Sequence, residues 1–299
     1  MKRLKKRELF GAIVPLSAIV GLLLLLATNT RAGNDAPLSA DISPMGLVSN
    51  LDLSCHRSRG GRPPVDVLQI THLNPVLQEM GLHEQEIFLH RLEQLCVPVA
   101  KNDVMPPEQY MEIVRWVDLA CFAATSESHE IELQLSQLNP VLVEMGIPDQ
   151  DILMGQLRQL CVPVVKNDVF PPEEVLELVR YIDVACYDIE TPAPHPFPLH
   201  LTHLNPVLID EGLKEQPVEV HIPKQLCVPV MKEHEIPPDH ILELVKWIDF
   251  LKYSEYSKIP LRLRHINPLF QDVEPFDIEL FEIQDLAVPV AKNGMLPPQ

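Results

Sequence analysis

The chain lacks the short motifs that usually mark an enzyme. It contains no GxSxG nucleophile elbow, no HExxH zinc motif, no Walker phosphate loop and no dinucleotide fingerprint. Glycine is scarce, at 11 of 299 residues against 30 prolines, which favours stiff turns over a flexible linker. No second apolar run of membrane-spanning length follows the N-terminal one. The sequence therefore predicts no catalytic site, no cofactor and no bound metal.

Positive charge is also in short supply. The chain has 24 lysines and arginines against 42 acidic residues, for a net charge of −18, and five of the basic residues fall within residues 1–7. An acidic surface repels the phosphate backbone, so we do not expect a nucleic-acid partner.

The N-terminal segment has the pattern of an export signal. A basic start precedes an apolar run from Leu9 to Ala27, and Thr30-Arg31-Ala32 offers a small-residue cleavage site. We expect residues 1–32 to be a signal peptide, residues 33–41 to be a linker, and the rest to be periplasmic, surface-exposed or secreted. An uncleaved signal anchor is the competing interpretation, because the run approaches a bilayer span of about 20 residues. Membrane contact is expected only through this segment.

The chain does contain an internal repeat. Four Asn-Pro dipeptides each follow a short apolar strand, and each is followed by a Leu-x-Val-Pro-Val segment; the dipeptides begin at Asn74, Asn139, Asn205 and Asn267, and the segments at Leu95, Leu160, Leu226 and Leu286. A regular period of about 65 residues predicts tandem modules. We expect an α+β fold of four disulfide-stapled modules, each with one helix and short antiparallel strands. Their expected ranges are 42–104, 105–169, 170–235 and 236–299.

Helix signals precede strand signals in each module. Proline and acidic residues suit a first helical turn, and apolar residues then recur at three- and four-residue steps, which predicts helices of about three to four turns over Pro107–Cys121, Val175–Cys186 and Pro238–Phe250. The stretch from Met45 to Cys55 is a degenerate copy of a helix end, so the first module also starts on a helix.

The segments between the helices alternate in polarity and predict short strands. Residues Glu86–Leu92 and Asp151–Leu157 are ambiguous between strand and helical turn. The proline in each Val-Pro-Val segment restricts that strand to an edge or a bulge.

Six cysteines in an exported chain indicate disulfides rather than metal or redox chemistry. They occupy two module positions, the helix end (Cys55, Cys121, Cys186) and the second strand (Cys96, Cys161, Cys227). The fourth module has Lys252 and Ala287 at these positions, so both partners are lost together. This joint loss predicts Cys55–Cys96, Cys121–Cys161 and Cys186–Cys227. A rival scheme joins each strand cysteine to the following helix, as in Cys96–Cys121 and Cys161–Cys186.

Several polar residues recur with the repeat. His72, His203 and His265 stand two residues before an Asn-Pro turn, where the second module has Gln137, and we interpret them as strand-face residues rather than metal ligands. Lys101, Lys166, Lys232 and Lys292 follow the Val-Pro-Val segments, and Asp118, Asp183 and Asp249 recur on the helices. A row of Lys–Asp pairs would form a ligand-binding stripe; the simpler interpretation pairs each aspartate with Arg115, Arg180 or Lys246 on the helix surface.

Three aromatic residues, Trp116, Tyr181 and Trp247, occupy one helix position beside the apolar stripe. Such a row offers flat area for sugars or peptides, whereas packing against the next module or the disulfide is the structural interpretation.

The Leu-Cys-Val-Pro-x-x-Lys strand resembles one in exported bacterial repeat proteins of unknown function, and this resemblance implies an extracytoplasmic, disulfide-bearing, β-containing module. Taken together, the sequence predicts an exported structural or interaction protein with an unknown protein or glycan partner. A carbohydrate- or peptide-binding protein that uses the aromatic row is the alternative, and a hydrolytic enzyme is the least favoured reading.

Overall fold

The computed structural model describes residues 42–192, 196–254, 259–266 and 273–299. The predicted signal segment and linker, residues 1–41, lie outside the described residues. The described residues belong to one compact unit of mixed α/β structure, mostly antiparallel strands with a few short helices. Within the described ranges, no helix is long and apolar enough to span a membrane.

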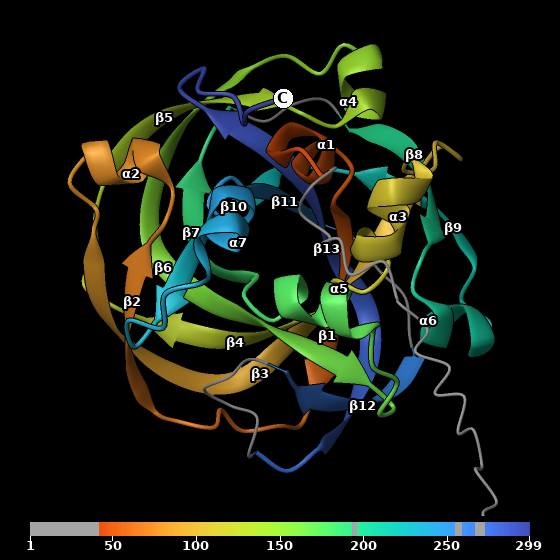
Figure 1. The fold of residues 1–299 in the computed structure, drawn as a ribbon. Helices are drawn as coiled ribbons and strands as arrows, with labels where there is room; N and C mark the ends of the chain where they lie inside the picture. Colours follow the sequence, from red (N-terminus) through yellow and green to blue (C-terminus); the bar gives the residue numbers. More distant parts are fainter. Residues whose placement is uncertain (1–41, 193–195, 255–258, 267–272) are drawn as a thin grey trace, which may run out of the picture. The chain divides into compact units, whose positions relative to one another are not determined.

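Eight antiparallel strands close into a ring (Figure 1). Each strand pairs with the next in the order β1, β13, β11, β10, β7, β6, β4 and β3, and β3 pairs back with β1. Because the first and last strands of this series are paired, the ring has no open end along which another strand could add. The ring strands are β1 (Asp52–Arg59), β3 (Glu84–Lys101), β4 (Leu119–Thr125), β6 (Gln150–Lys166), β7 (Asp183–Glu190), β10 (Pro223–Lys232), β11 (Phe250–Ser254) and β13 (Phe276–Lys292).

Five further strands form hairpins that interlock distant parts of the ring. β2 (Val67–His72) pairs with the first half of β3 and then, at its own end, with the end of β10. β8 (Phe197–His203) pairs with β9 (Glu215–Val220) and then with the end of β3. The contacts are therefore reciprocal: β2 reaches the strand that follows β9, which is β10, and β8 reaches the strand that follows β2, which is β3. β5 (Ile131–Gln137) and β12 (Ile259–His265) link β6 and β13 in the same way.

The helices form two sets that differ in position. In Figure 1 the first set gathers in the middle of the view inside the strands, and the second set lies toward the margin. The first set is α1 (Pro44–Ser49), α3 (Glu108–Val114), α5 (Glu173–Val179) and α7 (Asp239–Val245). The second set is α2 (Pro75–Glu79), α4 (Pro140–Glu144) and α6 (Pro206–Asp210).

The two faces of the ring strands carry separate cores. One face packs its apolar side chains against the hairpins and α2, α4 and α6. The other face carries all six cysteines and packs against α1, α3, α5 and α7. This second face is the inner one, because Lys252 on β11 donates hydrogen bonds to both Gln94 on β3 and Gln159 on β6, strands that lie three places away from it in opposite directions around the ring.

The predicted disulfide pairing is confirmed. Cys55–Cys96, Cys121–Cys161 and Cys186–Cys227 are bonded, and no free cysteine remains. The members of each pair lie directly opposite each other on adjacent antiparallel strands. The rival partners are close but not bonded: the Sγ atoms of Cys96 and Cys121 lie 3.6 Å apart. Three disulfides are consistent with an oxidising, extracytoplasmic location.

The predicted helices are too long. α3, α5 and α7 each have seven residues, and the chain then enters a ring strand, so the cysteines lie on β1, β4 and β7 rather than at helix ends. The physical reason is burial on both sides: Leu119, Ala120, Cys121 and Phe122 are all buried between the inner and outer cores. A strand buried on both faces reads as a continuous apolar run and loses its period of two.

Two other expectations need correction. The Asn-Pro dipeptides that the structure describes begin short helices rather than simple turns, and the fourth, at Asn267, lies outside the described residues. Pro98 does not lie in an edge strand; it sits where the neighbour of β3 changes from β4 to β8, and its carbonyl accepts from the Leu204 amide at 3.0 Å. Its missing N–H therefore costs little. The ambiguous segments Glu86–Leu92 and Asp151–Leu157 are strand.

Candidate functional site

Four buried ion pairs recur around the ring. Each joins the lysine at the end of a long strand to an aspartate at or just before the start of another ring strand, and all eight side chains are at most 4% exposed. The pairs are Lys101–Asp52, Lys166–Asp118, Lys232–Asp183 and Lys292–Asp249. The simpler sequence interpretation, an aspartate paired with a helix-surface cation, is therefore wrong. Arg115 and Lys246 pair instead with Glu112 and Glu243.

An asparagine completes three of these clusters. The Nδ2 of Asn139 donates to Asp52 Oδ2 at 2.6 Å, while its Oδ1 caps the first amides of α4. Asn74 joins Asp249 to α2 at 2.8 Å, and Asn205 joins Asp118 to α6 at 2.9 Å. One side chain thus fixes a helix start and satisfies a buried carboxylate in a distant part of the chain.

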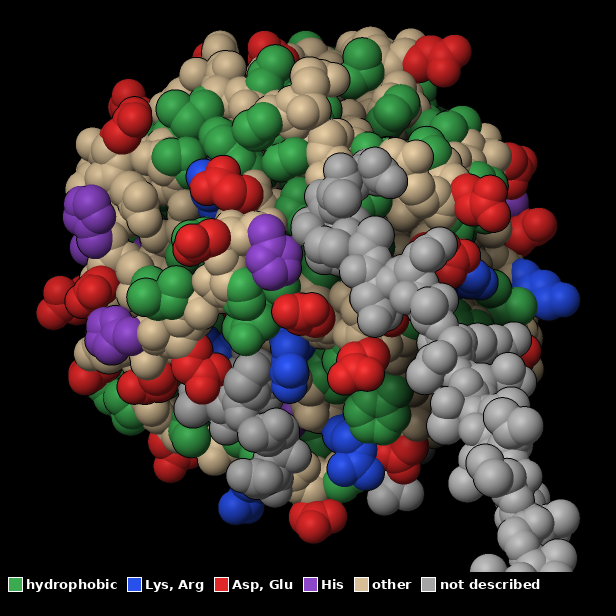
Figure 2. Space-filling model, in the orientation of Figure 1, with side chains coloured by type: hydrophobic (Ala, Val, Ile, Leu, Met, Phe, Trp, Pro, Cys, Tyr) green, Lys and Arg blue, Asp and Glu red, His purple; other side chains and the backbone are tan. Residues whose placement is uncertain are grey.

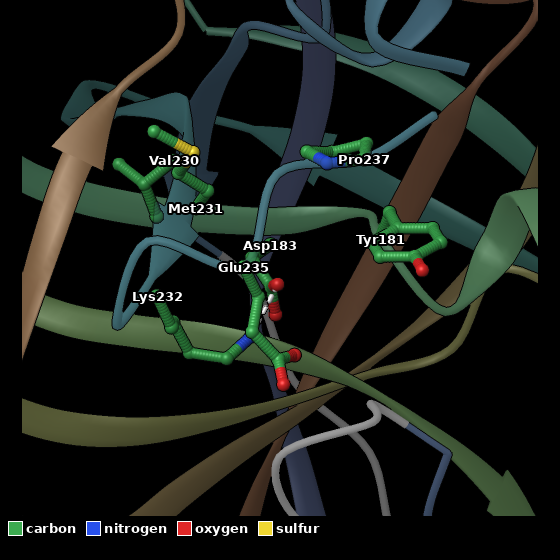
Figure 3. Close-up of a pocket in the computed structure, with 7 residues that line it drawn as sticks. All are labelled: Tyr181, Asp183, Val230, Met231, Lys232, Glu235 and Pro237. Atoms are coloured by element: carbon green, nitrogen blue, oxygen red, sulfur yellow. Dashed lines mark ion pairs between the residues drawn. The ribbon is translucent and has the colours of Figure 1, made fainter. Parts of the chain in front are cut away.

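Burial governs the electrostatics of these clusters. It raises the pKa of every paired aspartate and lowers that of every paired lysine, and the attraction between the partners opposes both shifts. For Asp249 the pKa is raised to about 6. Figure 3 shows Lys232 and Asp183 near Tyr181, Glu235 and Pro237, around a depression with no room for a water-sized sphere. This ion pair therefore leaves no room for a substrate beside it, and the other three pairs are equally buried.

The three repeated histidines are buried and lie apart. They end β2, β8 and β12, and burial lowers the pKa of each to about 4, so they are neutral at pH 7. His72 Nε2 lies 2.7 Å from the Tyr187 hydroxyl, and the His203 ring lies 5.8 Å from the His56 ring. Gln137 donates to the Tyr253 hydroxyl. Among the described residues, no group of three His, Cys, Asp or Glu side chains is arranged to hold a metal ion.

A polar cluster surrounds Lys252, which the sequence repeat aligns with the helix-end cysteines. Lys252 and Ala287 lie directly opposite each other on β11 and β13, as the bonded cysteines do elsewhere. The Lys252 Nζ donates to Gln94 at 2.7 Å and to Gln159 at 2.9 Å, and Gln94 donates in turn to Asp285. Burial lowers the pKa of Lys252 to about 8 against the attraction of Asp285 and Glu93.

The residues of the predicted aromatic row are partly buried. Trp116, Tyr181 and Trp247 each follow the end of a central helix, stand two residues before an ion-pair aspartate, and pack against the inner core. The structure distributes them around the ring on separate helix–strand connections. Their role in ligand binding stays a prediction.

Sequence reasoning missed a second set of residues near the same helices. A large apolar side chain stands directly before four of the five Pro-Pro pairs, all except the pair that follows Arg62. It is exposed in each of the four cases: Met105 (49%), Phe170 (47%), Ile236 (66%) and Leu296 (54%). The first three lead into α3, α5 and α7, and Leu296 leads to Pro298, whose carbonyl accepts from the Met45 amide of α1 at 2.9 Å. The signal was in the sequence, as a large apolar residue before Pro-Pro four times.

We call these four residues, with Trp116, Tyr181 and Trp247, the helix face. Figure 2 shows, in the orientation of Figure 1, hydrophobic side chains interspersed with acidic ones on the face that it displays. Comparison with known proteins found no matching protein family, no matching curated protein and no matching solved structure.

The dual role of the asparagine is testable at Asn139. Replacing Asn139 with Ala removes both the helix cap and the bond to Asp52, and we expect the free energy of unfolding to fall by about 2–4 kcal/mol. Asn139→Ser keeps a capping oxygen, so it should recover about 1 kcal/mol of this loss. Urea unfolding followed by far-UV circular dichroism measures both. Equal losses in the two variants would show that the Asp52 bond alone matters.

The ion pairs should give a pH dependence of a particular sign. Lys292→Met leaves Asp249 as an unpaired buried carboxylate, which should cost about 3–5 kcal/mol at pH 7.5. Because burial raises the folded-state pKa of Asp249, the folded state takes up a proton before the unfolded state does as pH falls. The loss should therefore shrink at pH 5, as read from urea unfolding at both pH values.

The control for this experiment is Lys292→Met combined with Asp249→Asn, which keeps an acceptor for Asn74 but cannot ionise. Its stability relative to wild type should vary less between pH 5 and pH 7.5 than that of the single variant. A single variant that lost more stability at pH 5 than at pH 7.5 would contradict the assigned role of Asp249.

Proposed function

We propose that this chain is an exported interaction protein built from four tandem modules, residues 42–104, 105–169, 170–235 and 236–299, which dock a partner on the helix face. The module assignment is supported by recurrence at matched positions. Each range contributes one Lys–Asp pair, one inner-core helix and two adjacent ring strands with Cys or its replacement in register. Export is supported by the basic and apolar N-terminal sequence and by the three disulfides.

The observation that carries the function is the repeated exposure of a large apolar residue. Single exposed apolar side chains are ordinary on protein surfaces and need no explanation. Here the same position is large, apolar and about half exposed or more in all four modules, although its identity changes among Met, Phe, Ile and Leu. The neighbouring aromatic position, in contrast, becomes Asn50 in the first module. Each of the four stands where the chain leads to a helix of the inner core, and exposed apolar residues that cluster on a surface mark interaction sites.

The charge beside these residues indicates the chemistry of the partner. The first turns of the three helices that follow them are acidic, with Glu108, then Glu173 and Glu174, then Asp239. A surface that alternates apolar and acidic groups is complementary to a protein segment with apolar and basic side chains. A basic amphipathic peptide segment fits this pattern better than a glycan does, because the aromatic rings are partly buried and offer less open flat surface.

The repeated polar residues support a binding role over a catalytic one. The lysines and aspartates that recur in every module are enclosed as ion pairs, and the histidines and glutamine are buried against aromatic or polar partners. The repeated Lys, Asp and His side chains are therefore buried in the framework, whereas an enzyme would place such residues in an open cleft. A hydrolytic enzyme stays the least favoured proposal.

The helix face can be tested directly because the chain has two tryptophans and both belong to it. We expect a synthetic amphipathic peptide with Leu and Lys or Arg to shield Trp116 and Trp247 from acrylamide quenching. A matched peptide with Glu in place of its basic residues should not. Replacing Met105, Phe170, Ile236 and Leu296 with Ser should weaken the shielding by about tenfold or more in peptide concentration.

The control variant carries Ser at four other exposed apolar positions, Val67, Phe88, Val143 and Ile222, which are 45–56% exposed but lie outside the helix face. It should bind the basic peptide as wild type does. Equal weakening in both variants would show non-specific apolar contact and overturn the proposal. Shielding by a neutral oligosaccharide but not by the basic peptide would favour the aromatic-row alternative.

The module assignment has its own test in the missing disulfide. Because Lys252 and Ala287 are directly opposed in register like the bonded pairs, the double variant Lys252→Cys with Ala287→Cys should form a fourth cross-link on oxidative folding. Non-reducing peptide mapping would recover a peptide pair joining the two positions. The single variant Lys252→Cys should retain one titratable thiol. Two free thiols in the oxidised double variant would contradict the equivalence of the fourth module.

A further inference from the structure

A groove of about 800 Å³ has none of the helix-face residues in its described lining. Its walls come from the end of β1, the loop that follows, and the bulged part of β3. Three arginines line it, Arg57 from β1, Arg62 from the loop and Arg91 from β3, and Glu93 is the one acidic residue among its described lining. The volume falls within the range of small-molecule sites.

The loop that carries Arg62 is held in a fixed position. Gly60 and Gly61 both have positive φ, at 101° and 74°, a conformation that side chains disfavour. A Cβ on Gly61 would come within 2.8 Å of the Phe276 ring, so the backbone is seated closely on that ring. The Gly61 carbonyl also accepts from the Leu92 amide at 3.4 Å. Arg62 and Arg91 are therefore presented from backbone segments that are tied together.

Arg62 and Arg91 differ from several exposed cations elsewhere on the chain. Elsewhere Arg115, Arg158, Arg264 and Lys246 each pair with a nearby carboxylate. In the described part of the structure, neither Arg62 nor Arg91 has a carboxylate within ion-pair distance. On a chain with 42 acidic residues against 24 basic ones, such a local excess of positive charge is informative.

Glu93, the acidic residue of the groove lining, already accepts a hydrogen bond from the protein itself. Glu93 accepts a hydrogen bond from Gln159 at 3.1 Å, and Gln159 accepts in turn from the Lys252 amine inside the ring. The carboxylate of Glu93 is thus turned toward the interior cation, and it neutralises the groove less than a free carboxylate would.

We propose that this groove binds a small multivalent oxyanion, a ligand with two or three carboxylate or phosphate groups. Guanidinium groups are planar donors that match such oxyanions, and arginines from three different segments line this groove. A long polyanion fits poorly, because beyond the groove the net charge of −18 would repel it. The ligand should instead place all of its charges within the groove.

Titration calorimetry at low ionic strength tests this with citrate for the carboxylate source and pyrophosphate for the phosphate source. We expect saturable one-to-one binding of at least one of them, and the stronger binder identifies the source. Arg62→Gln with Arg91→Gln should weaken it by about tenfold or more, because two charge-assisted bonds are lost. Both side chains are exposed, so the melting temperature should stay close to that of wild type.

The matched control is Lys214→Gln with Arg264→Gln, which removes the same charge outside the groove. It should bind the anion as wild type does. Equal weakening in the two double variants would show an effect of net charge alone and overturn the proposal. So would the absence of saturable binding for both anions. Citrate should leave the quenching of Trp116 and Trp247 unchanged, so this result is independent of the helix face.

Discussion

The rest of the structure depends on the burial of the Lys–Asp pairs. Removing two opposite charges from water is costly, and their attraction offsets this cost only when geometry is good and the remaining oxygens are satisfied. The asparagines at positions 74, 139 and 205 supply that satisfaction, and each does so from a part of the chain far from the aspartate it contacts. Each of these three clusters therefore fixes three things together: a strand end, a strand start and the beginning of a short helix.

The disulfides also lie on the inner face of the ring, but they connect only neighbouring strands. They join strands that are already adjacent in register, so they constrain local pairs rather than distant ones. Where the fourth pair is absent, Lys252 reaches across the ring to Gln94 and Gln159 and so connects three strands with hydrogen bonds. The disulfides thus link neighbouring strands covalently, whereas Lys252 links strands that are not neighbours through hydrogen bonds.

Much of the local structure could be predicted from the sequence, because it rests on short-range signals. The repeat located the Cys pairs through the joint change to Lys252 and Ala287, and polarity alternation located the hairpin strands. The helices were overextended because residues such as Leu119 and Phe122 are buried on both faces and lose the strand period. The pairing of β2 with β10 leaves no signature in either segment alone.

The candidate site was predicted in part. The aromatic row was visible as a repeated residue type, and the structure places its members after the central helices. The exposed residues before Pro-Pro escaped notice because a sequence cannot say which apolar side chains remain in water. The arginine groove escaped for a related reason: its residues come from β1, a loop and β3, which the fold brings together.

The interlocked hairpins have a consequence for the order in which the chain can fold. Asn74 and Asp249 are 175 residues apart, and His72 and Tyr187 are 115 apart, yet both contacts are buried. The first hairpin therefore finds its final neighbours only after most of the chain is available. A native state dominated by such distant contacts forms slowly, because loop closure must precede the contacts that stabilise it. During that interval the apolar faces of the early hairpins are uncovered, so aggregation competes with folding until the distant contacts form.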